Sequence, residues 1–249
     1  MASEKTYLVT GASRGLGLAI CHLLSDSGYI VIGVARESIE LRALEKILKQ
    51  QSPKSAVYAC DFASKQQTTK LISSLIDNHE VIDGVVHNVG VIEPIKPLSG
   101  TEISKWEKLI QVNLISVQHL TSGIYSLMKN SERCRVTTIS SGAAVNSLHS
   151  WSAYCVSKAG LDMWTRCLAE EGKSDNISAI SIAPGIVDTG MQQAIRNSNP
   201  DDFPMHQRFV EFKEHGDLVA PEIVASQLFE LIINQKMEQS GYRFDVRDL

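Results

Sequence analysis

A tyrosine and a lysine four residues apart, Tyr154 and Lys158, carry the clearest chemical potential in this chain. In a helix, positions four apart share a face, so the Lys158 ammonium can lie near the Tyr154 phenol. A free phenol titrates near ~10, and a close positive charge favours the phenolate and lowers that pKa. Ser141, thirteen residues earlier, could hold a carbonyl oxygen beside the phenol. The three side chains suit proton transfer to a carbonyl group, although a Tyr-x-x-x-Lys spacing alone is most often plain helix surface.

A glycine-rich segment near the N-terminus predicts a phosphate-binding turn. The apolar run 7–9 reads as a buried strand, a Gly-x-x-x-Gly-x-Gly pattern follows, and apolar residues then recur at helical spacing. Small residues let the backbone approach a pyrophosphate, and a helix N-terminus favours its negative charge. The alternative is a tight strand-to-helix turn without a ligand. The candidate cofactor-binding residues in this turn are Gly11, Ser13, Arg14, Gly15, Leu16 and Gly17.

The end of the second apolar run, 29–35, indicates which dinucleotide would bind. An acid at this position would accept the ribose 2′-hydroxyl of NAD, but this chain has Arg36 there. A guanidinium offers a fork of donors that suits a 2′-phosphate, and Arg14 can reach the same corner. The two arginines therefore predict NADP(H). Glu37 follows directly and would weaken that preference, and Arg36 could also be a solvated strand-end charge.

Strand-like apolar runs alternate with helical patterns along the whole chain. This alternation predicts one α/β domain over residues 1–249, a Rossmann-type doubly wound parallel sheet with helices on both faces. Ligands in such sheets bind at the carboxyl ends of the strands. The strands are expected near 6–10, 29–35, 55–60, 82–87, 134–140, 177–183 and 241–244, and the helices near 15–27, 39–50, 65–78, 102–129, 152–172 and 221–235.

These residues resemble the short-chain dehydrogenase/reductase family, in its roughly 250-residue branch. The match covers nearly the whole chain, and the motifs occur in the family's order and at its spacing. The matching elements are Thr10-Gly-x-x-x-Gly-x-Gly17, Asp61, Asn88 with Gly90, Asn113, Ser141, Tyr154-x-x-x-Lys158 and Pro184-Gly185.

The resemblance implies catalytic roles for four residues. Tyr154 would be the acid/base, and Ser141 would polarise the substrate carbonyl. Lys158 would bind the nicotinamide ribose and lower the tyrosine pKa. Asn113, on the middle helix, would anchor a water that extends the proton relay.

The same resemblance implies further cofactor contacts. Asp61 would touch the adenine, Asn88 would lie beside the adenosine ribose, and Thr189 would hold the carboxamide and pyrophosphate side. One departure is His87, where the family's Asn-Asn-Ala-Gly usually begins, and we interpret it as a structural strand-end residue. The remaining cofactor candidates are Gly90, Pro184, Gly185 and Val187, together with Tyr154 and Lys158.

A narrower resemblance concerns the sepiapterin reductase and benzil reductase branch. The segments 142–144, 151–154 and 183–191 and the tail 240–245 are similar to that branch. In sepiapterin reductases a tail aspartate at the place of Asp245 anchors the pterin, but Asp245 could equally pair with Arg243 or Arg247. Similarity to benzil reductases implies aromatic or vicinal diketones as substrates.

The segment 190–216 is longer than an ordinary strand–helix connection. It combines prolines and asparagines with three phenylalanines and two methionines. We expect a mobile flap with short helices that closes over cofactor and substrate, with apolar residues lining a pocket for a bulky ketone. Simple packing onto the domain is the alternative for any single residue.

Composition excludes several classes of function. The net charge of −4 gives no excess of positive charge for nucleic acid or an anionic membrane. No apolar run approaches the ~18 residues of a transmembrane helix, and the chain enters its first strand without room for a signal peptide. The five scattered cysteines suit reduced thiols in the cytoplasm or nucleus, and no metal-binding pattern occurs.

The sequence as a whole predicts an NADPH-dependent carbonyl reductase that acts on a small-molecule ketone. The main alternative is a sepiapterin reductase. A non-catalytic module that senses NADPH is a different class, but such modules usually lose the tyrosine or the lysine. The resemblance also implies a homodimer or homotetramer, paired through long middle helices.

Overall fold

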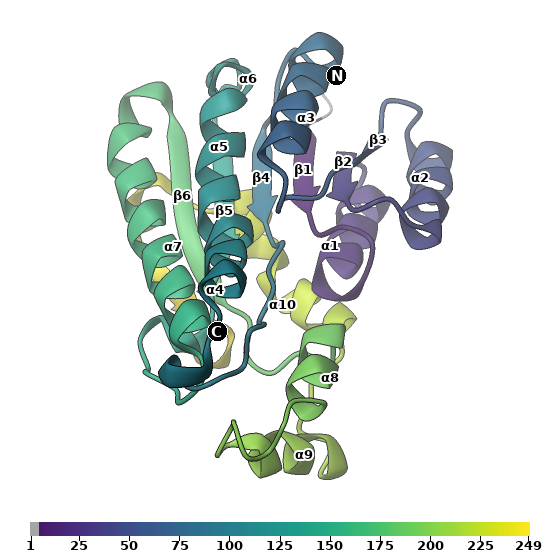
Figure 1. The fold of residues 1–249 in the computed structure, drawn as a ribbon. Helices are drawn as coiled ribbons and strands as arrows, with labels where there is room; N and C mark the ends of the chain where they lie inside the picture. The colour runs from purple at the N-terminus through teal and green to yellow at the C-terminus, as the bar shows by residue number, and fades with distance from the viewer. Residues whose placement is uncertain (1–4) are drawn as a thin grey trace.

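Seven parallel strands form the centre of the molecule, in a computed structural model that describes residues 5–249 (Figure 1). Their order across the sheet is β3-β2-β1-β4-β5-β6-β7, so the chain reverses its direction of winding between β1 and β4. Such a reversal opens a crevice at the carboxyl ends of the strands. The strands are β1 (Thr6–Thr10), β2 (Ile30–Ala35), β3 (Ala56–Ala59), β4 (Gly84–His87), β5 (Cys134–Ile139), β6 (Ile177–Ala183) and β7 (Arg243–Asp245).

Helices cover both faces of the sheet because alternate strand residues point to opposite sides. Tyr7 and Val9 belong to the core that packs against α1, α2 and α10, whereas Leu8 belongs to the core under α3, α5 and α7. Both faces are therefore apolar, as expected for a parallel sheet. The helices are α1 (Gly15–Asp26), α2 (Ile39–Gln51), α3 (Lys65–Asn78), α5 (Ser116–Gly123), α7 (Ser152–Glu171) and α10 (Pro221–Asn234).

The middle helix, expected over 102–129, is helical from Ile103 to Gly123 and from Tyr125 to Lys129, with a change of helix type inside it. It consists of α4 (Ile103–Ile110), a π-helical turn (Gln111–Ile115), α5 and α6 (Tyr125–Lys129). π-helical turns are rare and occur mostly at functional sites. The turn here contains Asn113, whose side chain bonds to the loop after β4. The helix predicted near 102–129 is therefore present, and its π-helical turn is a local feature that apolar periodicity does not reveal.

The segment 190–216 contains two helices, α8 (Gly190–Arg196) and α9 (His206–Glu214), which extend beyond the carboxyl edge of the sheet at the bottom of Figure 1. Phe203, between them, is 0% exposed and stacks on Trp151 with ring centroids 5.4 Å apart. Lys213 on α9 pairs with Asp188 at 2.7 Å, next to the exit of β6. The segment is thus packed onto the domain through Phe203, between its two helices, and through Lys213 on α9.

Within residues 5–249, no helix is long and apolar enough to cross a membrane.

Candidate active site

A cavity of about 2000 Å³ lies along the carboxyl edge of the sheet, where the predicted site residues converge. It extends from the glycine turn after β1, past the ends of β4 and β5, to α8 and α9. Of the predicted residues, only Gly17 and Asn113 do not line it. Both lie directly behind the cavity wall, where they support residues that do.

The glycine turn is shaped by close contact with Asn88. Asn88 Nδ2 donates to the Thr10 carbonyl at 2.9 Å and to the Gly11 carbonyl at 3.3 Å. Gly11 has φ 69°, and a Cβ on Gly17 would lie 2.3 Å from the Gly11 oxygen and 2.4 Å from Asn88 Nδ2. Glycine is therefore required at both positions, because L side chains would be strained or would clash. The turn leaves its backbone open to the cavity, as a phosphate cradle requires.

The opposite rim of this turn comes from the segment after β6. Gly185 has φ 74°, and Val187 forms a parallel bridge with Val219 that directs the chain back over the sheet. The methyl group of Thr189 lies 3.1 Å from the position that a Cβ on Gly15 would take. Pro184, Gly185, Val187 and Thr189 therefore line the same cavity as the predicted phosphate turn.

Two arginines at the β2 end of the cavity have no ion-pair partner within residues 5–249. Arg14 directly precedes α1 and Arg36 directly follows β2, and both line the cavity. Glu37, which could have neutralised Arg36, is instead bound by Arg42, whose Nε lies 2.8 Å from Glu37 Oε1. This hydrogen bond is the main reason that the pKa of Glu37 is lowered. Both guanidinium groups line the cavity, and that of Arg14 lies near Gly190 and acts electrostatically on Glu40.

Asp61 also lines the cavity, beside these arginines. Its Oδ1 accepts from the Ala63 amide at 3.0 Å, and its own amide donates to Gln67 Oε1 at 2.9 Å. The loop after β3 is therefore fixed by local hydrogen bonds. Its position is compatible with the adenine contact that the resemblance implied.

Tyr154 and Lys158 occupy one face of α7, as their spacing predicted. The Tyr154 hydroxyl is 3.7 Å from Met191 Sδ, and its ring packs edge-on against Trp151. The Lys158 ammonium lies 5.8 Å from the Tyr154 ring centroid and donates to the Ile139 carbonyl at 2.7 Å. Tyr154 is 5% exposed and Lys158 2%, so both groups are held away from bulk water.

Burial controls the titration of these two groups. It raises the pKa of Tyr154 to about 12, against the opposing effect of the Ser141 hydroxyl. It lowers the pKa of Lys158 to about 8, against the opposing effect of the Asp162 carboxylate. The prediction that the pKa of Tyr154 is lowered is therefore wrong for this structure, because burial disfavours the phenolate.

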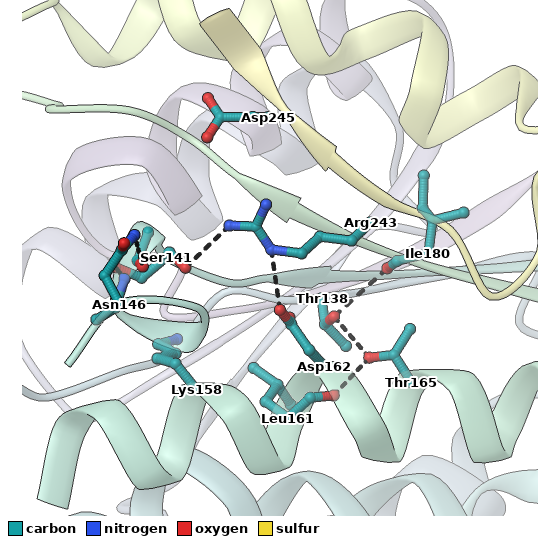
Figure 2. A network of polar contacts seen from close by, with 12 residues as sticks. Thr138, Ser141, Asn146, Lys158, Leu161, Asp162, Thr165, Ile180, Arg243 and Asp245 are labelled. Atoms are coloured by element: carbon teal, nitrogen blue, oxygen red, sulfur yellow. Dashed lines mark hydrogen bonds and ion pairs between the residues drawn. The ribbon is translucent and has the colours of Figure 1, made fainter. Parts of the chain in front are cut away.

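Ser141 follows β5 and begins a short turn, Gly142–Ala144, with the Ala143 amide donating to its Oγ at 3.1 Å. The residue lines the cavity beside Tyr154 and Lys158. Its carbonyl accepts a hydrogen bond from Arg243 Nη2 at 3.2 Å (Figure 2). The serine is thus held from both its side chain and its backbone.

Asn113 braces the loop that follows β4. Its Oδ1 accepts from the Val91 amide at 2.8 Å, and its Nδ2 donates to the Val91 carbonyl at 2.9 Å and to Ser157 Oγ at 3.1 Å. The side chain is fully engaged and only 1% exposed. These contacts fix the chain next to Gly90, whose Cβ position would lie 3.7 Å from Asn113 Oδ1 and 3.6 Å from Lys158 Nζ.

His87 is a core residue. It is 2% exposed, its Nε2 lies 2.9 Å from Thr121 Oγ1, and its ring packs edge-on against Trp164. Burial lowers its pKa to about 3, so the ring stays neutral. The interpretation as a structural strand-end residue agrees with these contacts.

The C-terminal tail contributes residues whose partners the sequence left open. Asp245 lines the cavity and pairs with Arg247, whose Nε lies 2.7 Å from Asp245 Oδ1. Arg243 instead binds Asp162 on α7. The partner of Asp245 is therefore Arg247. Met191 and Arg243 were not among the predicted site residues, and only the folded chain brings them to Tyr154 and Ser141.

The fold and the site together are those of an oxidoreductase of the dinucleotide-binding type, with Ser141, Tyr154 and Lys158 gathered after β5 at the carboxyl edge of the sheet. Residues 5–200 match the short chain dehydrogenase family. A benzil reductase ((S)-benzoin forming) of Saccharomyces cerevisiae is 34% identical over 92% of this chain and 90% of its own length. A benzil reductase ((S)-benzoin forming) of Bacillus cereus is 32% identical over 93% of this chain and 95% of its own length.

Among solved structures, the KRED1-Pglu enzyme is similar, with a TM-score of 0.88 and 33% identity over 96% of this chain and 99% of its own. A short chain dehydrogenase/reductase of Saccharomyces cerevisiae, YIR035C, has a TM-score of 0.89 at 29% identity, over 98% of this chain and 96% of its own. The chain belongs to the short chain dehydrogenase family, and it is an oxidoreductase acting on CH–OH and C=O groups.

Proposed function

We propose that the protein is an NADPH-dependent carbonyl reductase that acts on aromatic or vicinal diketones. The observation that carries this proposal is the layout of the cavity. Ser141, Tyr154 and Lys158 line one part of it, and the unpaired Arg14 and Arg36 line another. A reducible carbonyl and a phosphorylated dinucleotide therefore have complementary places in one continuous site.

The residues present fit NADP(H). Gly11 and Gly17 leave no room for a Cβ, which keeps the turn backbone accessible to a pyrophosphate. Arg14 and Arg36 provide planar donor forks for a 2′-phosphate, and Glu37 is occupied by Arg42. Lys158 Nζ, near Gly90 and Tyr154, is placed to donate to a nicotinamide ribose. When bound, the reduced nicotinamide supplies a hydride to the carbonyl carbon.

The protein's own residues handle the proton. With a pKa of about 12, Tyr154 is protonated at neutral pH and can donate its hydroxyl proton to the carbonyl oxygen. The Ser141 hydroxyl lies beside it and polarises the same oxygen. Lys158 is poised near neutral pH by its pKa of about 8, so it can return a proton toward Tyr154 after each turnover.

Apolar side chains support a bulky, aromatic substrate. The cavity beside Tyr154 is lined by Met191, Trp151, Leu148, Met205, Phe209 and Phe212. Sites of this kind bury most of a small ligand and orient it with few polar groups. Phe203 is not part of this lining, because it is fully buried beneath Trp151. The two relatives at 32% and 34% identity are benzil reductases, which supports the same substrate class.

Asp245 gives one reason to keep a sepiapterin-type pterin ketone as a second candidate, because its carboxylate lines the cavity. Its pairing with Arg247 favours the diketone, since the carboxylate is already satisfied. The Arg247 hydrogen bond is also the main cause of the lowered pKa of Asp245.

The test is a panel of benzil, other vicinal diketones, short aliphatic ketones and sepiapterin with NADPH or NADH, following the loss of nicotinamide absorbance. We expect benzil-type diketones with NADPH to give the highest kcat/KM. Asp245→Ala should change sepiapterin and benzil reduction by less than a few fold if Asp245 only pairs with Arg247. Selective loss of sepiapterin reduction would favour the pterin reading, and turnover restricted to acyl thioesters or sugars would contradict both.

We also infer a homodimer or homotetramer. Exposed apolar side chains lie on α4 and α7. Ile103 on α4 is 69% exposed, and Met163 and Val156 on α7 are 54% and 50% exposed. Association of copies through these helices would bury them. Light scattering coupled to size exclusion measures the mass directly, and a mass of 27.4 kDa at micromolar concentration would contradict the inference.

A further inference from the structure

Arg243 on β7 connects the tail of the chain to two elements of the active site. Its Nε lies 3.0 Å from Asp162 Oδ2 on α7, and its Nη2 donates to the Ser141 carbonyl at 3.2 Å. Figure 2 shows the guanidinium between the helix and the loop that carries Ser141. One planar group therefore sets the distance between these two elements.

Asp162 is a carboxylate with little access to water. Its side chain is 14% exposed, and its Oδ1 is buried without a hydrogen-bond partner within residues 5–249. Arg243 provides its ion pair. Removing one partner of such a pair leaves a charge that the surroundings cannot solvate, which is far costlier than losing an exposed pair.

Lys158 stands one helical turn before Asp162 on the same face of α7, as Figure 2 shows. Its ammonium donates to the Ile139 carbonyl at 2.7 Å, and the Asp162 carboxylate already acts on it electrostatically. A lysine side chain has a flexible stem and can turn toward a new partner. Lys158 and Arg166 stand four residues before and after Asp162 on α7, and Lys158 is the one of the two that is buried. Without Arg243, Lys158 is therefore the buried cation of this face that the orphaned carboxylate would attract.

We propose that Arg243 is a positioning residue, which neutralises Asp162 so that Lys158 stays directed toward Tyr154 and the cofactor. The same guanidinium holds the Ser141 carbonyl and thereby the orientation of the serine. Arg243 itself touches neither the phenol nor the ammonium. Its influence on substrate turnover rests on the proposed reductase function, whereas its influence on Lys158 can be measured through cofactor binding alone.

The test compares Arg243→Met, Asp162→Asn and the double variant Arg243→Met/Asp162→Asn with the wild type. Lys173→Met is the control, because it removes an exposed cation that lies beyond the end of α7. The fluorescence of the bound nicotinamide gives the NADPH affinity of each variant. Steady-state kinetics with benzil give kcat and KM, and urea unfolding gives the stability. We expect Arg243→Met to weaken NADPH binding by about tenfold, within the range measured for contacting residues, and to lower kcat more than it raises the KM for benzil.

The double variant is the decisive arm. It should recover most of the lost NADPH affinity, because the carboxylate that competes for Lys158 is gone. Arg243→Lys should recover part of it, since an ammonium can pair with Asp162 but lacks the fork that also reaches Ser141. A purely structural role would predict that the double variant stays as weak as Arg243→Met.

Three results would overturn the proposal: NADPH binding by Arg243→Met equal to that of Lys173→Met, a double variant without recovery, or losses that follow unfolding free energy alone. If Arg243→Met does not fold, Arg243→Gln takes its place, because it removes the charge and keeps a polar side chain. If the wild type reduces no ketone, the proposed function fails, while the NADPH affinities still decide the role of Arg243.

Discussion

Burial acts in opposite directions on the two central side chains of the site. It raises the pKa of the Tyr154 phenol to about 12 and lowers that of the Lys158 ammonium to about 8. Both shifts favour the neutral form, because a low-dielectric environment disfavours charge of either sign. The pair is therefore prepared to donate a proton from the tyrosine and to exchange one at the lysine.

Removing only the phenol hydroxyl tests the donor. Tyr154→Phe should retain the fold and NADPH binding, since the ring still packs against Trp151. Its kcat should fall by about 10²–10⁴-fold, the usual contribution of a positioned proton donor. Steady-state kinetics with benzil and a parallel NADPH titration measure the two quantities. A variant with more than about a third of normal turnover would mean that another group is the acid.

The lowered lysine pKa has a signature in the stability of the cofactor-free protein. Above pH 8 native Lys158 loses its proton, while in the unfolded chain it stays protonated up to about 10.4. The unfolded state then binds more protons, so this residue's contribution to the unfolding free energy rises between these pH values. The wild type should gain stability relative to Lys158→Met over this window, by a few kcal/mol at most.

Urea unfolding at pH 7, 8, 9 and 10 gives this difference directly. The exposed Lys173→Met serves as the control, and its difference from wild type should stay flat with pH. A flat difference for Lys158→Met as well would show that the ammonium is not penalised by burial.

At the scale of elements, the end of β2 decides the cofactor. Arg36→Asp places an acid where a 2′-phosphate would lie and should reduce the NADPH-over-NADH preference in kcat/KM by one to several powers of ten, at ~1.4 kcal/mol for each. Arg42→Met should reduce it more weakly, because Glu37 is then released next to Arg36. Equal use of both cofactors by the wild type would contradict this assignment.

The sequence predicted the elements that follow simple periodicity. The strand expected at 177–183 is β6 (Ile177–Ala183), and the helix at 152–172 is α7 (Ser152–Glu171), because apolar runs and helical spacing are local properties. The π-helical turn around Asn113 was not predicted, since Asn113 is held by hydrogen bonds to Val91, 22 positions earlier in the chain.

The site residues themselves divide in the same way. Ser141, Tyr154 and Lys158 were predicted because their types and spacing carry chemistry. Two contacts were not predicted: that of Met191 with the Tyr154 phenol, and the ion pair between Arg243 and Asp162. The ion pair joins residues 81 positions apart, which only the folded chain brings together. The sequence also does not reveal how deeply Tyr154 is buried. The predicted direction of its pKa shift was wrong for that reason.

At the scale of the whole molecule, the segment with α8 and α9 connects substrate binding to stability. Phe203 is fully buried between Trp151 and Phe209, whereas Phe212 lines the cavity. Phe203→Ala should lower the unfolding free energy by about 3–5 kcal/mol, and it should reduce kcat because Trp151 supports Tyr154. Phe212→Ala should instead raise the KM for benzil with a smaller loss of stability.

Urea unfolding and benzil kinetics on the two variants check this division. Similar losses of stability for Phe203→Ala and Phe212→Ala would mean that both side chains serve packing alone. The division into a buried Phe203 and a substrate-contacting Phe212 would then be wrong.

The position of β1 between β2 and β4 has a consequence for how the protein is made. A ribosome that has released residues up to His87 has delivered β3, β2, β1 and β4, which are adjacent in the finished sheet. This half carries the glycine turn and both arginines, so we expect it to collapse first. Until β5 emerges, β4 presents an unpaired edge, the kind of surface through which nascent chains aggregate. Slow translation between residues 88 and 139 would therefore lower the yield of folded protein, and chaperones that shield strand edges would restore it.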